Sequence, residues 1–142
     1  MSRLRKNLAL SKAMGYRCYQ ANGAFHTSFM VSLDPIPITW CGPLGNEGVR
    51  EVSFDHVELA GDDHFAIRMP DWLESLDVAH HARKTIITTQ ALKVRFLNTL
   101  RDIVGVRCPK NALGAPLVSD YDLIDASAEE VVDALLKIVS KP

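Results

Sequence analysis

The dipeptide Asn22-Gly23, with alternating apolar and polar residues on both sides, is the feature that most restricts the fold of this chain. From Ala24 to Leu33 every second residue, starting at Phe25, belongs to a mostly apolar set, which is the two-residue period of a strand with one buried face. Asn-Gly accepts the positive φ angles of a tight turn better than most dipeptides. The sequence therefore predicts an antiparallel hairpin with arms at residues 16–20 and 24–33.

A helix is predicted before this hairpin, and further strands after it. Ser2 is suited to cap a helix that runs to about Met14, and Gly15 stands where helices commonly end in a left-handed residue. In the longest of the later strands, a bulge near Asp55 and His56 is needed to bring the apolar residues on either side of it to one face. These further strands are predicted at residues 35–40, where two prolines indicate a sheet edge, 49–59 and 64–69.

From Pro70 onward the apolar residues recur with the helical period of 3.6. Thr88 or Thr89 is suited to cap one helix, and Ser127 and Glu130 have the S-x-x-E spacing of a capping box at the start of another. We therefore expect an α+β fold with an N-terminal helix, a four- to five-stranded, mostly antiparallel sheet and three C-terminal helices that cover one face of it. The C-terminal helices are predicted over residues 70–84, about 89–104 and from 127 onward, with an irregular stretch at 106–125.

Length and composition indicate a small soluble protein. A chain of 142 residues fits one core, so residues 1–142 are predicted to form a single domain. The three cysteines, Cys18, Cys41 and Cys108, lie far apart, which argues against a disulfide framework or a zinc knuckle and favours a reducing compartment. No apolar run reaches membrane length, so we expect a cytoplasmic protein without membrane contact. An organellar address stays open, because no acidic residue precedes Asp34.

Charge is distributed in blocks, although the net charge is only -1. Residues 1–33 carry five bases and no acids, and residues 83–110 carry seven bases against Asp102 alone. The segments that follow these two blocks are acidic. Because local potential steers association, a basic block is expected to attract an acidic partner, unless the blocks of opposite sign pair with each other inside the fold.

The first functional hypothesis follows from these blocks: a non-enzymatic binding or assembly protein, without a cofactor, whose basic surface contacts an acidic protein or a nucleoprotein complex. Self-association between zones of opposite charge is a further possibility. Phe96 is the only aromatic residue between positions 83 and 110, so the stacking platform of a single-strand binder is not indicated. The residues expected to contact the partner are Lys93, Arg95, Arg101, Arg3, Arg5 and Lys6.

The second hypothesis is a small metal-dependent or acid–base hydrolytic enzyme. Glu74, Asp77 and His81 have the i, i+3, i+7 spacing that places two carboxylates and an imidazole on one face of a helix. The alternative for this face is ordinary solvated polar side chains. His80 falls on the apolar arc and is expected to be buried or half-buried and bonded to a backbone carbonyl. A metal needs a further ligand, for which the candidates are His56, Asp62, Asp63 and His64.

Overall fold

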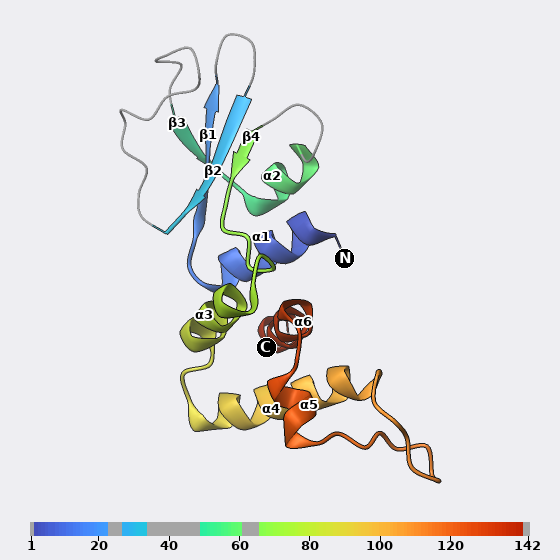
Figure 1. Cartoon of the computed structure of the whole chain (residues 1–142). Helices are drawn as coiled ribbons and strands as arrows, with labels where there is room; N and C mark the ends of the chain where they lie inside the picture. The colour runs from blue at the N-terminus through green and yellow to red at the C-terminus, as the bar shows by residue number, and fades with distance from the viewer. Residues whose placement is uncertain (1, 23–26, 34–48, 61–65, 141–142) are drawn as a thin grey trace. The chain divides into compact units, whose positions relative to one another are not determined.

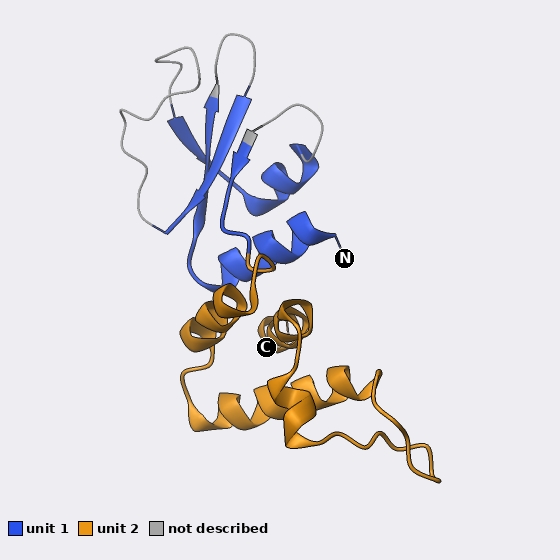
Figure 2. Ribbon diagram, in the orientation of Figure 1, with its two compact units in different colours: residues 1–71 blue, residues 72–142 orange. Residues whose placement is uncertain are grey.

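The computed structural model describes residues 2–22, 27–33, 49–60 and 66–140. The chain divides into two compact units, residues 1–71 and residues 72–142, which are coloured separately in Figure 2. Whether the two units behave as the single domain expected from the length stays a prediction.

In the residues that the structure describes, the first unit is a four-stranded mixed sheet with two helices (Figure 1). The order of strands in the sheet is β3-β1-β2-β4. Strand β1 is antiparallel to both β2 and β3, whereas β4 is parallel to β2. The elements of this unit are α1 (Arg3–Ala13), β1 (Arg17–Asn22), β2 (Thr27–Ser32), β3 (Val49–Val52), α2 (Phe54–Ala60) and β4 (Ala66–Arg68).

The predicted hairpin is confirmed, since β1 and β2 pair in antiparallel register with Cys18 opposite Val31 and Gln20 opposite Phe29. The turn itself, residues 23–26, lies outside the described residues, as does the strand predicted at 35–40. The helix before the hairpin is confirmed as well. The Ser2 side chain accepts a hydrogen bond from the backbone N–H of Arg5, and Gly15 has a φ of +88°.

The predicted strand over residues 49–59 is wrong after Val52, because the chain turns into helix α2 there. Ser53 starts this helix: its side chain accepts from the backbone N–H of His56 at 3.1 Å, and its carbonyl accepts from that of Val57 at 3.3 Å. Phe54 and Val57, three residues apart, then share the face that packs into the core. A helical turn, and not a bulge, thus brings the apolar residues on either side of Asp55 and His56 to one face of the fold.

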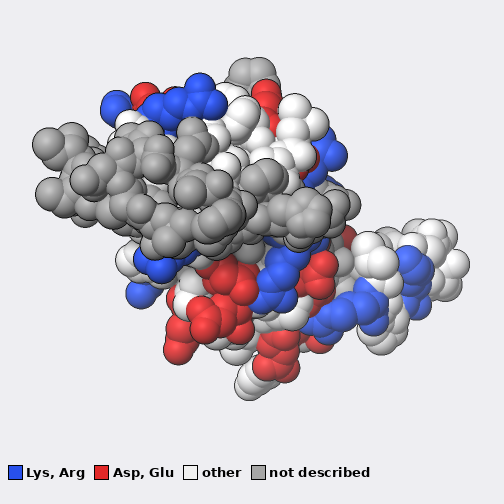
Figure 3. All heavy atoms as spheres, turned by 90° about the horizontal axis from the view of Figure 1, so that it is seen from above, with Lys and Arg blue, Asp and Glu red and all other residues white. Residues whose placement is uncertain are grey.

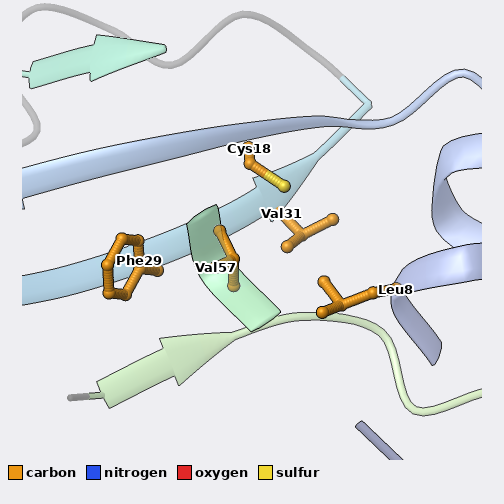
Figure 4. Close-up of a cluster of buried hydrophobic side chains, with 5 residues drawn as sticks. All are labelled: Leu8, Cys18, Phe29, Val31 and Val57. Carbon is orange, nitrogen blue, oxygen red and sulfur yellow. The ribbon is translucent and has the colours of Figure 1, made fainter. Parts of the chain in front are cut away.

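Helices α1 and α2 supply the residues that cover one face of the sheet. Leu8 of α1 and Val57 of α2 are buried against Cys18 of β1 and against Phe29 and Val31 of β2 (Figure 4). The alternating residues Phe29 and Val31 of β2 therefore form part of the core of the first unit, as the two-residue period predicts.

The second unit is helical and consists of α3 (Leu76–Ile86), α4 (Gln90–Gly105), α5 (Asp120–Ile124) and α6 (Ala128–Val139). Helix α6 packs against both α3 and α4, and α5 packs against α4. The predicted caps Thr89 and Ser127 are confirmed, and Glu130 completes the capping box. The short helix α5 was not predicted, although Ser119 and Asp122 form a capping box of the same kind at its start.

Helix α3 begins six residues later than the sequence pattern predicts. Ser75 caps it by accepting from the backbone N–H of Val78, so residues 70–75 are not helical. The α+β class is confirmed, whereas coverage of the sheet by the C-terminal helices stays a prediction. Among the helices of the described residues, none has the length and apolar character needed to cross a bilayer.

Candidate functional site

A groove of about 480 Å³ opens on the second unit between α3, α4 and α5. Its floor and walls are apolar, and basic side chains stand among them. We call it the α3–α4–α5 groove. The residues that line it are His80, Arg83 and Ile87 from α3 and its C-cap, Lys93, Phe96, Leu97 and Leu100 from α4, and Leu123 and Ile124 from α5.

The sequence builds this groove by giving α4 apolar residues on more than one face. Phe96, Leu100 and Val104 follow one another at intervals of four and are buried. Leu97 lies one residue further round the helix and remains 49% exposed. Ile124, at the end of α5, is 70% exposed. Large apolar side chains that stay exposed beside a groove are typical of a docking surface, whereas isolated ones are ordinary.

The basic side of the groove is formed by His80 and Arg83, one helical turn apart on α3. The Nε–H of Arg83 donates a hydrogen bond to Nδ1 of His80 at 2.9 Å, so this nitrogen carries a lone pair and the imidazole is neutral. His80 is half-buried, as expected. Its partner, however, is the Arg83 guanidinium and not a backbone carbonyl.

Burial lowers the pKa of His80 below its ordinary value, and the positive charges of Arg83 and Lys84 lower it further. Asp77, one turn earlier on α3, has the opposite and smaller effect. At neutral pH the pair formed by His80 and Arg83 therefore carries a single positive charge. Lys93 adds a second positive charge to the groove from α4.

Neither Arg83 nor Lys93 forms an ion pair with any carboxylate of the described residues, and the same holds for Arg95 and Arg101. Of the three predicted contact residues on α4, only Lys93 lines the groove. Arg101 is exposed and Arg95 is half-buried, both away from the groove. Lys93 therefore belongs to the candidate groove, whereas Arg95 and Arg101 do not.

The basic residues predicted on α1 are not free for a partner in the same way. Arg3 donates two hydrogen bonds to the Asp71 carboxylate, and Arg5 lies 3.2 Å from Glu58. Lys6 is buried. In the first unit, therefore, part of the basic block pairs with the acidic block that follows it in the sequence. In the parts of Figure 3 that are not grey, basic and acidic side chains lie next to one another.

The residues of the metal hypothesis are only partly brought together. Asp77 and His81 lie on α3, but Glu74 precedes the helix and lacks the helical spacing on which the hypothesis depends. The His81 ring stacks on Trp72, with ring centroids 6.4 Å apart and planes 13° apart. His56 lies on α2, with its ring edge-on to Phe29.

Asp62, Asp63 and His64 lie outside the described residues. Within the described ranges, no three side chains of the metal-binding types converge on one point.

A second depression, of about 380 Å³, lies between α4 and α6 and contains charges of both signs. Its Arg107 donates to the Glu130 carboxylate at 3.0 Å, so these two charges already satisfy each other. Less apolar surface is also available here than in the α3–α4–α5 groove, because charged residues of both signs line most of it. We therefore regard the α3–α4–α5 groove as the candidate site.

Sequence reasoning missed most of this site. His80 and Arg83 at i and i+3, and Lys93 and Leu97 at i and i+4, were visible spacings that place each pair on one helix face. No spacing indicates that the two faces meet, because that depends on how α6 holds α3 and α4 together.

The sequence matches no protein-family model, and neither curated proteins nor solved structures give a match. The site must therefore be interpreted from its own chemistry.

Proposed function

We propose that the protein is a non-enzymatic binding protein whose α3–α4–α5 groove captures an acidic, amphipathic segment of a protein partner. The observation that carries this proposal is the combination of an apolar groove, exposed Leu97 and Ile124 beside it, and two cations, Arg83 and Lys93, that have no carboxylate partner among the described residues. A helix that lays its apolar face in a groove is a common mode of peptide recognition.

Charge and apolar contact have different roles in this proposal. Burial of the exposed apolar side chains contributes roughly 25 cal/mol for each Å² removed from water and supplies most of the affinity. The two cations contribute little by themselves at an exposed rim, but they select acidic over basic segments and accelerate association. The proposal keeps the acidic partner expected from the basic block at residues 83–110, and it moves the contact from the whole block to Arg83 and Lys93.

The probe for a first test is a synthetic, fluorescently labelled helical peptide of about 18 residues, with leucines at i, i+3, i+4 and i+7 and glutamates beside them. A peptide with lysines in place of the glutamates is its control. We expect anisotropy titrations to give a micromolar Kd for the acidic peptide, and much weaker binding for the basic one. Equal affinity for both peptides, or for neither, would contradict the proposal.

Two charge reversals on α4 locate the site. Lys93→Glu is expected to weaken binding of the acidic peptide by at least about fivefold, since an attraction becomes a repulsion. Arg101→Glu makes the same change of net charge on the same helix but outside the groove, and is expected to change the Kd less than twofold. Similar losses in both variants would mean that the general charge of α4, and not the groove, holds the peptide. Binding of nucleic acid in place of the peptide, or self-association, would replace the proposed partner class.

A further inference from the structure

The hydrogen bond between His80 and Arg83 places a titratable acceptor inside the proposed binding site. Both side chains line the groove, and the Arg83 Nε–H points at Nδ1 of His80. This bond can exist only while Nδ1 is unprotonated, because a protonated imidazole has donors at both nitrogens and no acceptor. The protonation state of His80 therefore decides where the Arg83 guanidinium is held.

We infer that the groove is pH-gated: protonation of His80 at Nδ1 breaks its bond with Arg83, turns one cation into two, and makes the groove bind an acidic segment more tightly as pH falls. This inference rests on the proposed function and names its regulation. At higher pH the neutral imidazole holds Arg83 by Nε. At lower pH the imidazolium and the released guanidinium each offer donors to carboxylates of the partner.

The surroundings of His80 favour such coupling. The other charged groups on its own helix are Lys84, which disfavours protonation, and Asp77, which favours it. Helix α4 contributes Lys93 to the groove, and α5 contributes only the apolar Leu123 and Ile124. Helix α6 also packs on α3, but the charged residues that it shares with the second depression are Glu129, Glu130, Asp133 and Lys137, and none of them acts on the pKa of His80.

The balance of charge near His80 is thus positive in the free protein and becomes more negative when an acidic segment binds. Bringing a carboxylate close to a histidine raises the pKa of the imidazole by about one unit or more. Proton uptake on binding then requires, by linkage, that the affinity rise by the same factor, about tenfold, as pH falls through the interval between the two pKa values. The sign follows from the uptake, since a complex that holds more protons is favoured by acid.

The test uses the full-length protein and the acidic peptide at several pH values between roughly 5.5 and 8, where the glutamates of the peptide stay ionised. For the wild type we expect the Kd to fall steadily toward acid pH, and to approach the tenfold limit at pH values below the lowered pKa of His80 in the free protein. His80→Gln keeps a neutral acceptor for Arg83 and removes the titration, so its Kd is expected to vary less than twofold. His81→Gln removes the adjacent exposed histidine, which lies outside the groove, and is expected to keep the wild-type dependence.

A second measurement on the free protein tests the switch without the peptide. Nitrogen-15 NMR is expected to show the Arg83 Nε–H signal moving with the same midpoint as the His80 ring signals. An Arg83 signal that does not follow His80 overturns the inference. So does a His80→Gln protein that keeps the pH dependence of binding, and in that case the proposed function stands. Absence of peptide binding at every pH removes the proposed function and the gating with it.

Discussion

Replacing Leu135 with alanine should destabilise the second unit strongly, because this side chain is fully buried on the helix that holds α3 and α4 together. Helix α6 places a row of buried residues on its packing face, and Leu135 lies near the middle of that row. Leu97 provides the matched control. It is also a leucine within a helix, but half of its surface is exposed beside the groove.

The magnitude follows from what the substitution removes. Leu135→Ala deletes the three carbon atoms beyond Cβ, which at about 0.8 kcal/mol for each buried methylene costs about 2.4 kcal/mol. The cavity that remains adds to this loss, and measured Leu→Ala substitutions in cores fall at about 2–5 kcal/mol. We therefore expect a loss of about 3 kcal/mol for Leu135→Ala. Leu97→Ala leaves no closed cavity and should cost less than about 1 kcal/mol.

Urea unfolding followed by far-UV circular dichroism measures both variants. With a slope of about 2 kcal/mol per molar urea, Leu135→Ala is expected to lower the midpoint by about 1.5 M and Leu97→Ala by less than about 0.5 M. Peptide binding should reverse this order, since Leu97→Ala removes an apolar side chain from the lining of the proposed peptide site while the fold persists. Equal midpoints for the two variants would refute the assignment of α6 as the core of this unit and of Leu97 as a surface contact.

Two further predictions concern ionisable groups away from the groove. Burial opposes ionisation of Glu130, but its hydrogen bonds with Arg107 and with Ser127 outweigh this and hold its pKa below the ordinary 4.5. The stability that the Glu130 carboxylate contributes is therefore present above pH 4.5 and is lost as pH falls through the lowered pKa. Glu130→Gln should therefore lower the urea midpoint at pH near 7 but match the wild type well below pH 4.5, and a constant difference would contradict this. Burial, assisted by the charge of Glu51, raises the pKa of Cys18 to about 12. At a pH near 8, iodoacetamide should label Cys18 at least about a hundredfold more slowly in the native protein than in urea, as measured by peptide mass spectrometry.

Local signals in the sequence were sufficient to predict the elements whose ends are set by hydrogen bonds between side chains and the backbone. Ser2, Thr89 and Ser127 each cap a helix as predicted, because the bond from the cap to the N2 or N3 backbone depends only on residues nearby in the chain. The hairpin was predictable for a similar reason, since turn chemistry and alternation both act over a few residues. Such signals hold without knowledge of the rest of the fold.

The errors occur where a short apolar pattern fits two structures. Phe54 and Val57 agree with a bulged strand and with a helical turn, and their contacts with the core of the first unit favour the turn. For α3, Trp72 and Leu73 extend the helical arc in the sequence, but Ser75 caps the chain later and moves the start to Leu76. That shift of boundary also removed Glu74 from the face on which the metal hypothesis depended.

The basic block identified the region of the candidate site but not its contact residues, and the reason is physical. Counting charges along the sequence treats Arg3 and Lys93 alike, although Arg3 is paired with Asp71 and Lys93 has no carboxylate partner among the described residues. What distinguishes Lys93 is the exposed apolar surface beside it, and that surface exists because α4 uses one set of residues to pack and leaves another in the groove. Packing and binding should therefore be separable by mutation within this one helix.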